Sequence, residues 1–501
     1  MKQAKCIVDK DYVIAEVDPK LYGSFIEHLG RAVYGGIYEP DHPLADEQGF
    51  RKDVIELVKA LHIPIVRYPG GNFVSGYQWT DGIGPRENRP RRLDYAWCST
   101  ETNEIGIDEF ADWCQKVGAQ VMAAVNLGTG TPQNAGHMVE YCNHPAGTYW
   151  SDLRRRNGHG QPHAIKVWCL GNEMDGPWQT GSLTAEDYGK KARETAKIMK
   201  WVDPGIELVA CGSSSPLMPT YPEWDRVVLE HTYEQVDYLS LHRYYENEGC
   251  NEDFLAAFFD MDHFIKTIAA TADYVQAKTR SKKRLKLSFD EWNVWYIKKQ
   301  TRSPIPWEVA PAILEESYSL LDALVFGGLL CTLLNNADRV RMACLAQLVN
   351  VIAPIYTQKG GGAIKQAIFY PFQQVSQYGS GNALKTLMTC PALETKRYGA
   401  VPSVQSVATF NEAAAQLTVF ALNCNQQDDL QLDLDLRSFA SVSLIEHVIL
   451  DGPDLDAQNS FTRPENVVPR RSPASPNDKN QTPQVLLPKA SWNVLRFSAK
   501  G

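Results

Sequence analysis

Two glutamates in the sequence each stand at the end of an apolar, β-prone segment. Glu173 closes the run Trp-Cys-Leu-Gly-Asn-Glu, and Glu291 lies in the run Leu-Ser-Phe-Asp-Glu-Trp-Asn. A buried strand has this pattern when it delivers a polar side chain at its C-terminal tip. Two carboxyl groups can share the cleavage of a glycosidic bond, one as acid/base and one as nucleophile. With Asn172 before the first glutamate and Trp292 and Trp295 beside the second, the pair favours sugar chemistry over two unrelated, solvated strand ends.

The segments around these glutamates alternate between strand-like and helix-like patterns from about residue 20 to about residue 350. Strands are expected at residues 22–26, 63–68, 120–126, 165–173, 206–211, 236–244, 284–291 and 340–347. Helices are expected at residues 51–61, 107–117, 132–142, 184–202, 224–233, 253–279 and 312–335. About eight strand–helix units predict an α/β fold, a (β/α)8 TIM barrel with helices outside a parallel sheet. An open doubly wound sheet is the alternative that this pattern leaves.

The C-terminal part of the chain has a different texture. Leu430, Leu432, Leu434 and Leu436 alternate with polar residues, which is the period of a β-strand with one buried face. We therefore predict a catalytic barrel over residues 18–380 and an additional all-β sandwich, jelly-roll-like, over residues 381–501. Residues 1–17 are also β-like, and we expect them to pair with the sandwich because chain ends often lie close together.

Composition excludes several classes of protein. The 501 residues carry a formal net charge of −9, so no basic field attracts nucleic acid or an anionic membrane. The eleven cysteines are scattered, odd in number and without a CxxC pair, which favours reduced thiols over a disulfide framework or structural zinc. The first residues contain no apolar h-region, so we expect no signal peptide, and residues 320–334 have the pattern of a buried helix rather than a membrane span. We expect a cytoplasmic protein.

Other motifs with known chemistry are weak. Gly128 and Gly130 follow a strand, but Gln133 replaces the third glycine of a dinucleotide-binding fingerprint. No HExxH motif occurs, and a metal site built from His231, His242 and His263 is disfavoured. We therefore expect no cofactor and no metal.

Longer strings around the two glutamates resemble glycoside hydrolase family 51, a clan A family of retaining glycosidases. The strings are Phe25-Ile26-Glu27-His28, Arg67-Tyr68-Pro69-Gly70-Gly71-Asn72-Phe73, Gly171-Asn172-Glu173-Met174-Asp175-Gly176-Pro177-Trp178 and Glu291-Trp292-Asn293-Val294-Trp295. The resemblance runs through the predicted barrel. It implies an exo-acting α-L-arabinofuranosidase that acts on arabinose-containing oligo- or polysaccharides, and a homohexamer. Another clan A activity, such as endoglucanase or β-xylosidase, and a catalytically silent carbohydrate-binding protein remain the alternatives.

The same resemblance implies a role for individual residues. Glu173 would be the acid/base and would start protonated, and Glu291 would be the ionised nucleophile of a double displacement. Asn172 would hydrogen-bond the 2-hydroxyl of the sugar. Arg67 and His242 would position Glu291 and keep it ionised. The sugar pocket would also be lined by Glu27, Asn72, Trp97, Tyr244, Trp295 and Gln347.

Overall fold

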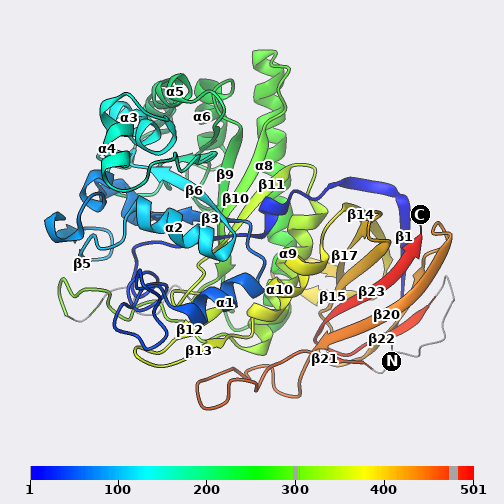
Figure 1. Cartoon of the computed structure of the whole chain (residues 1–501). Helices are drawn as coiled ribbons and strands as arrows, with labels where there is room; N and C mark the ends of the chain where they lie inside the picture. Colours follow the sequence, from blue (N-terminus) through cyan, green and yellow to red (C-terminus); the bar gives the residue numbers. More distant parts are fainter. Residues whose placement is uncertain (1, 297–302, 304, 473–482, 501) are drawn as a thin grey trace.

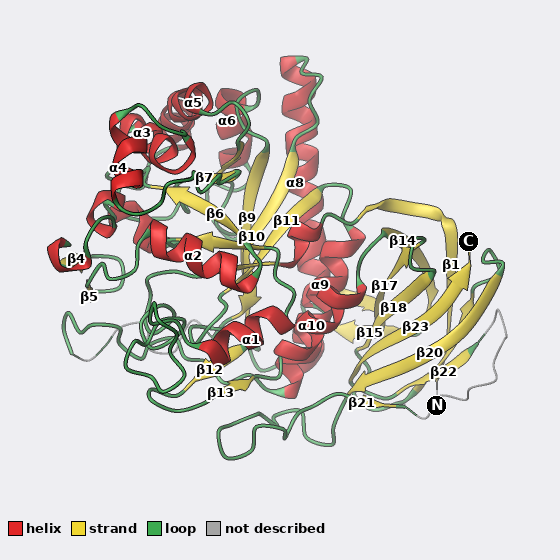
Figure 2. Cartoon of the chain, in the orientation of Figure 1, coloured by secondary structure: helices red, strands yellow, loops and turns green. Residues whose placement is uncertain are grey.

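Eight parallel strands close into a barrel in the computed structural model, which describes residues 2–296, 303, 305–472 and 483–500 (Figures 1 and 2). The barrel strands are β2 (Gly23–Phe25), β3 (Ile65–Tyr68), β6 (Gln120–Val125), β7 (Val167–Leu170), β8 (Glu207–Ala210), β9 (Tyr238–Tyr245), β10 (Lys286–Val294) and β11 (Val340–Ala346). They follow one another around the barrel in chain order, and β11 closes it against β2. The predicted (β/α)8 barrel is confirmed, and the open sheet is wrong.

The strands are apolar because both of their faces are covered. Inside the barrel, Phe25, Ile65, Met122, Cys169 and Val209 belong to one buried cluster. Outside, helices pack around the sheet, so that a strand has no solvated face and needs no polar alternation. Polar side chains are then delivered where the strands end. Those ends meet at one face of the barrel.

The helices largely follow the predicted pattern, with three differences. They are α1 (Lys52–Ala60), α2 (Ile107–Val117), α3 (Pro132–Asn143), α4 (Tyr149–Arg156), α5 (Ala185–Val202), α6 (Glu223–Thr232), α7 (Asn251–Leu255), α8 (Ala257–Thr279), α9 (Leu320–Asn335) and α10 (Phe369–Tyr378). Helices α4 and α10 are not among those expected from the sequence. The helix expected at 253–279 is divided into α7 and α8. The helix expected from residue 312 begins only at Leu320, because Ser319 caps it by accepting from the Asp322 amide at 3.2 Å.

Helix α9 lies between the barrel and the β-rich C-terminal part (Figure 2). Every residue from Leu320 to Leu334 is buried, as expected of a helix that is apolar all round. Phe326 packs on Trp292 of β10, with ring centroids 4.8 Å apart. On the other side, a Cβ at Gly327 would come within 2.5 Å of the Trp492 ring, so this glycine permits the close approach of the β-rich part. Among the described residues, no helix is long and apolar enough to cross a membrane.

The C-terminal part is rich in β-structure, as predicted. Its main sheet runs in the order β21-β20-β23-β18-β17-β14-β1-β19-β22. These strands are β1 (Lys2–Glu16), β14 (Asn382–Thr389), β17 (Val404–Asn411), β18 (Gln416–Asn423), β19 (Leu430–Asp435), β20 (Ser441–Leu450), β21 (Arg470–Arg471), β22 (Gln484–Leu487) and β23 (Ser491–Lys500). The other strands of the described residues form three small hairpins: β4 (Arg92–Asp94) with β5 (Ser99–Glu101), β12 (Ile355–Thr357) with β13 (Ala363–Lys365), and β15 (Ala392–Thr395) with β16 (Gly399–Pro402).

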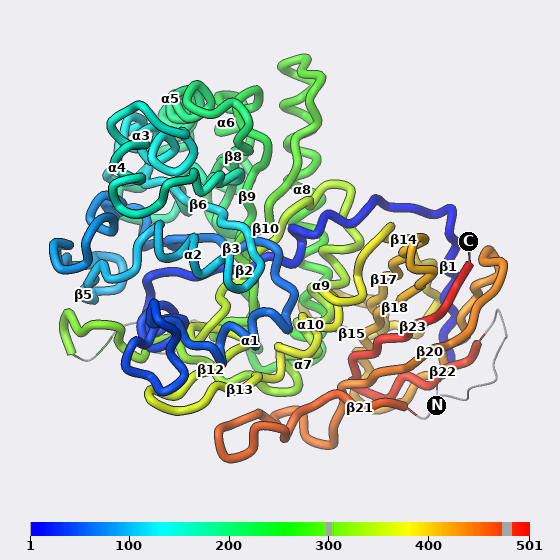
Figure 3. Tube along the Cα trace, in the orientation of Figure 1, coloured from blue at the N-terminus to red at the C-terminus, as the bar shows by residue number. Residues whose placement is uncertain are grey.

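The N-terminal strand β1 lies within this sheet, so the two ends of the chain share one unit (Figure 3). It pairs antiparallel with β14, where Lys5 faces Thr389, and parallel with β19, where Ala4 faces Leu432. Its alternate residues Ala4, Cys6 and Val8 pack in the core of the unit. The division of the chain at residues 17 and 380 stays a prediction.

Candidate active site

Glu173 and Glu291 meet at the C-terminal end of the barrel. Glu173 follows β7, the fourth barrel strand, and Glu291 lies in β10, the seventh. One carboxylate oxygen of each lies within 4.8 Å of the other and of a His242 nitrogen. Both side chains are almost buried, with exposed fractions of 9% for Glu173 and 5% for Glu291. Inverting glycosidases hold their carboxyl groups about 6.5–9.5 Å apart to admit a water, and retaining ones about 5–5.5 Å apart. The short separation fits the second geometry.

Two donors fix the Glu291 carboxylate. Arg67 of β3 donates from Nη1 to Oε1 at 2.6 Å, and Tyr244 of β9 donates from its hydroxyl to Oε2 at 2.8 Å. The second guanidinium nitrogen of Arg67 donates to Asn172 Oδ1 at 2.7 Å. Arginine stays charged in proteins, so each of its hydrogen bonds to a carboxylate is charge-assisted. The nucleophile candidate therefore has one orientation, and the same guanidinium also sets that of Asn172.

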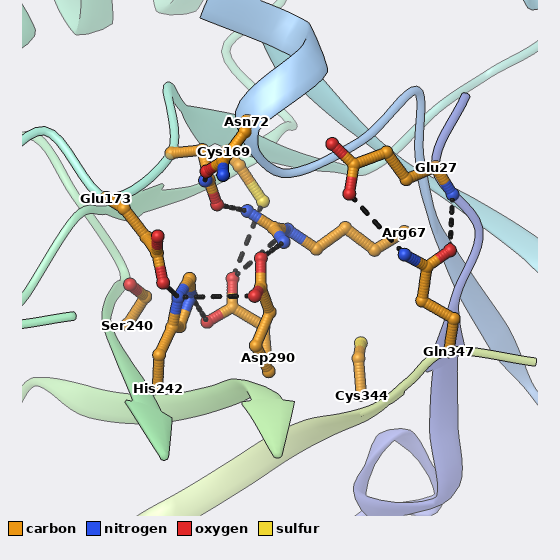
Figure 4. Close-up of polar contacts among 12 residues, drawn as sticks. Glu27, Arg67, Asn72, Cys169, Glu173, Ser240, His242, Asp290, Cys344 and Gln347 are labelled. Carbon is orange, nitrogen blue, oxygen red and sulfur yellow. Dashed lines mark hydrogen bonds and ion pairs between the residues drawn. The ribbon is translucent and has the colours of Figure 1, made fainter. Parts of the chain in front are cut away.

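A second cation lies between the two glutamates. His242 Nδ1 contacts Glu173 Oε1 at 2.9 Å and lies 3.6 Å from Glu291 Oε2, while Nε2 is 3.4 Å from Asp290 Oδ1 (Figure 4). Burial disfavours the imidazolium, but the charge of Glu291 and the contacts with the Asp290 and Glu173 carboxylates outweigh it and raise the pKa of His242 to about 10. His242 is thus a cation at neutral pH. Of its contacts with the two glutamates, the one with Glu173 is the shorter. The family resemblance, in contrast, implies that His242 positions Glu291.

An irregularity in β10 brings Asp290 and Glu291 into the same cluster. In a regular strand, successive side chains point to opposite faces. Here the pairing of β10 with β9 changes register between Ser288 and Glu291, as at a β-bulge. Asp290 Oδ2 consequently lies 3.5 Å from Arg67 Nε while Glu291 binds the same guanidinium. The buried Asp290 therefore adds a second negative charge beside Glu291, which helps to balance the cations Arg67 and His242.

Glu173 is held from the solvent side by Trp178, which donates from Nε1 to Oε2 at 2.7 Å. The Trp178 ring is 51% exposed, so it lies at the mouth of the site. The turn that carries Glu173 begins at Gly171, whose φ of 90° favours glycine. Asp175 anchors its other end by accepting from the Ser214 amide at 3.0 Å. Trp178 stands in the string that carries the resemblance, but its role was not predicted.

Glu27 organises the opposite wall. Its Oε1 accepts from the Phe73 amide at 2.8 Å and from Trp97 Nε1 at 3.0 Å, and Trp97 projects from the β4–β5 connection. The Glu27 amide donates to Gln347 Oε1 at 3.0 Å, and Gln347 Nε2 donates back to Glu27 Oε2 at 3.4 Å (Figure 4). Burial raises the pKa of Glu27 to about 8. A carboxyl group that carries a proton at neutral pH can donate to a sugar hydroxyl as well as accept from one.

Asn72 and Asn172 contact each other beside the Pro-Gly-Gly turn that follows β3. Asn172 Nδ2 lies 3.4 Å from Asn72 Oδ1 and 3.4 Å from Gln179 Oε1. A Cβ at Gly71 would lie 3.0 Å from Glu291 Oε1, and one at Gly70 would lie 2.5 Å from Glu27 Cγ. The Pro-Gly-Gly turn after β3 is therefore required for the walls to come together. Gln179 is a further polar residue of the site that the sequence analysis missed.

Aromatic rings pack beside the two glutamates. Trp295 and Tyr244 pack edge to face with centroids 5.0 Å apart. Trp97, Tyr244 and Trp295 rest on one apolar cluster that includes Leu29 and Ile313. The structure thus brings the predicted glutamates, asparagines, aromatic residues, Gln347, Arg67 and His242 to one end of the barrel. What each of them does stays a prediction.

Comparisons with known proteins identify similar chains along nearly the whole length. Family models described as "Alpha-L-arabinofuranosidase 1 domain" and "Alpha-L-arabinofuranosidase C-terminal domain" match residues 57–282 and 290–491. The chain is 56% identical to intracellular exo-α-(1→5)-L-arabinofuranosidase 1 of Bacillus subtilis, over 99% of each chain. It is 48% identical to an exo-α-(1→6)-L-arabinofuranosidase of Bifidobacterium longum, over 99% of this chain and 97% of the relative.

Solved structures agree with these matches. A family 51 α-L-arabinofuranosidase from Bifidobacterium longum superimposes with a TM-score of 0.95 at 44% identity, covering 99% of this chain and 100% of that one. The arabinose complex of an α-L-arabinofuranosidase from Thermotoga maritima gives a TM-score of 0.88 at 34% identity, covering 99% of both chains. The similarity therefore includes the barrel, the β-rich part and the face that carries the two glutamates.

Proposed function

The chain belongs to the α-L-arabinofuranosidases of glycoside hydrolase family 51, and we propose that it releases terminal arabinofuranose from α-(1→5)-linked arabinan-type saccharides with retention of configuration. The linkage is proposed because relatives of 56%, 54% and 53% identity are named for the α-(1→5) bond. The observation that carries the mechanism is the separation of at most 4.8 Å between oxygens of Glu173 and Glu291. It supports direct attack by one carboxylate rather than attack by an interposed water.

In the first step, Glu291 attacks the anomeric carbon while Glu173 gives its proton to the departing glycosidic oxygen. Arg67 and Tyr244 hold the two Glu291 oxygens, so the attacking carboxylate is oriented before the substrate arrives. Asn172, oriented by the same Arg67, donates to the sugar 2-hydroxyl, a contact that strengthens in the transition state.

In the second step, Glu173 takes a proton from water, which displaces Glu291 from the sugar. Formation of the glycosyl ester removes the negative charge of Glu291, so the repulsion between the two close carboxylates disappears. Glu173 is then surrounded by the donors His242 and Trp178, which suit a carboxylate acting as base. One residue can therefore be acid in the first step and base in the second.

Sugar recognition is assigned to the remaining polar side chains of the pocket. Glu27 and Gln347 form one reciprocal pair, and Asn72 accepts from Asn172. A site that hydrogen-bonds each hydroxyl rejects a sugar that leaves those groups unpaired. Trp97, Tyr244 and Trp295 would limit the volume to a furanose, in agreement with an exo-acting enzyme.

The deciding experiment follows the first-formed product by proton NMR, with α-(1→5)- and α-(1→6)-linked arabinobiose and an aryl α-L-arabinofuranoside as substrates. We expect the α-anomer of arabinofuranose to appear first and the (1→5) substrate to be cleaved faster. Initial formation of the β-anomer would overturn the double displacement. Preferential cleavage of cellulose or a β-xyloside would favour the alternative clan A activities, and absence of turnover would favour a silent binding protein.

We also propose a cytoplasmic location and a hexameric assembly. Support for the location comes from relatives named intracellular and from the eleven cysteines, all free in the structure. The hexamer rests on the family resemblance alone. Light scattering coupled to size-exclusion chromatography would test it, and a mass of one or two chains would contradict it.

A further inference from the structure

A second cluster of ionisable side chains lies apart from the catalytic glutamates. Asp108 of α2 and His159 and His163, from the segment between α4 and β7, have ligand atoms within 4.8 Å of one another. Asp112, one helical turn after Asp108, lies 3.8 Å from His159 Nδ1 through its Oδ1. We propose that these four side chains form a zinc site that joins α2 to the segment leading into β7.

The backbone of the histidine segment is fixed independently of any ligand. Arg154, fully buried, donates to the carbonyl oxygens of His159 at 3.1 Å and His144 at 2.7 Å. The His163 amide donates to the Cys142 carbonyl at 2.8 Å. Asp108 and Asp112 are likewise fixed by α2. Since these backbones are already ordered, an ion would have to fix only side chains.

The carboxylate at the centre of the cluster already has the supporting contact that metal ligands have. Tyr141 donates from its hydroxyl to Asp108 Oδ2 at 2.6 Å, and Asn157 donates to the Tyr141 hydroxyl at 3.0 Å. These contacts orient Asp108 so that Oδ1 points to the histidines, 2.7 Å from His163 Nε2. In metal sites, hydrogen-bond partners of this kind fix the orientation of the side chains that bind the metal.

The position of the His159 ring is not explained by any hydrogen bond of the described residues. Asp108 and His163 satisfy each other, but the His159 ring makes no hydrogen bond among the described residues, and its nearest carboxylate oxygen is the 3.8 Å contact to Asp112. Tetrahedral zinc with bonds of about 2.0–2.2 Å places its ligand atoms roughly 3.4 Å apart. An ion therefore needs Asp108 Oδ1 and His163 Nε2, now 2.7 Å apart, to separate by about 0.7 Å, and the His159 nitrogen, within 4.8 Å of both, to approach them by up to about 1.4 Å. Asp112 lies outside this group of three and must move farther to join it.

The donor set selects the metal. Two imidazole nitrogens with carboxylate oxygens suit Zn²⁺, whereas Ca²⁺ and Mg²⁺ take oxygen ligands. The His159 and Asp112 side chains are 24% and 26% exposed, which leaves an entry path from solvent. The site lies outside the catalytic cluster, and its expected effect is on stability rather than on the reaction.

The test uses the full-length chain after treatment with a chelator, titrated with ZnCl2 near neutral pH and followed by calorimetry and thermal unfolding. We expect one zinc ion per chain, with at least about tenfold weaker binding in His159→Ala. At a free zinc concentration 100 times Kd, the unfolding equilibrium constant should fall about 100-fold. His263→Ala, which removes an exposed histidine of α8, is the matched control and should bind like the wild type. Hydrolysis should be unchanged in both variants.

A second variant separates this site from the catalytic one, because Glu173, His242 and Glu291 also bring ligand atoms together. If zinc binding is lost in Glu291→Gln and kept in His159→Ala, the ion occupies the catalytic cluster and the proposal is overturned. Absence of zinc binding to the wild type, or equal affinity of wild type and His159→Ala, overturns it as well.

Discussion

The hydroxyl of Tyr244 gives a sharp test of how the nucleophile candidate is held. Tyr244→Phe removes the donor to Glu291 Oε2, 2.8 Å away, and keeps the ring that packs on Trp295. A hydrogen bond to a charged group contributes about 1.5–3 kcal/mol. If that stabilisation is lost from the transition state, kcat/KM falls about 10- to 150-fold. Activity should not disappear, because Arg67 still holds Oε1 at 2.6 Å.

The assay is steady-state hydrolysis of an aryl α-L-arabinofuranoside, with thermal unfolding measured in parallel. The neighbouring residue on β9 provides the control. Tyr245 is buried, and its ring lies under the Arg243 guanidinium at 4.8 Å instead of facing Glu291. Tyr245→Phe should therefore leave kcat/KM within about twofold of the wild type, since no hydrogen bond to the nucleophile is removed.

Two results would refute this reasoning. A Tyr244→Phe enzyme within about threefold of wild-type kcat/KM would mean that the hydrogen bond contributes less than about 0.7 kcal/mol at the transition state. Equal losses in Tyr244→Phe and Tyr245→Phe would mean that the substitutions disturb β9 as a whole rather than the contact with Glu291.

Four further outcomes are expected. Glu291→Ala should nearly abolish hydrolysis, and azide should restore turnover with a glycosyl azide of inverted configuration; a near wild-type rate would contradict the nucleophile role. Glu173→Ala should slow substrates with poor leaving groups most and flatten the basic limb of the pH–rate profile, whereas equal losses on all substrates would count against a proton donor. Aryl α-L-arabinofuranoside should be cleaved at least about a hundredfold faster than aryl β-D-xylopyranoside by kcat/KM, or roughly 2.7 kcal/mol, and comparable rates would refute the sugar assignment. In the folded state the pKa of His242 is about 10, above its ordinary 6.5. The stabilisation that the His242 charge gives the folded state is therefore complete below about pH 6.5 and lost as the pH rises through about 10. Denaturant unfolding should accordingly show that the difference in stability between the wild type and His242→Gln shrinks over that range.

Periodicity was enough to predict the barrel and its two glutamates, because the ends of all parallel strands meet at one face whatever the loops do. It could not predict that Asp290 joins Glu291 in one cluster. A strict two-residue period separates the two side chains, and only the register shift between β9 and β10 overrides it. Trp178 and Gln179 were missed for another reason: they lie in the loop after β7, and their contacts depend on how that loop folds back. The later start of α9 was readable in principle from Ser319 and Asp322, a capping pair.

Helix α9 also determines whether the catalytic barrel can be separated from the rest of the chain. Its inner side packs on Trp292 of the strand that carries Glu291, and its outer side meets Trp492 where Gly327 leaves room. Cutting the chain after the barrel would turn that outer side into a water-exposed apolar stripe, of the kind that drives aggregation. Grafting the barrel onto another carrier, or shortening the enzyme for expression, would therefore require a redesigned α9 surface. The β-rich unit covers the outer side of α9 and so keeps this apolar surface away from water.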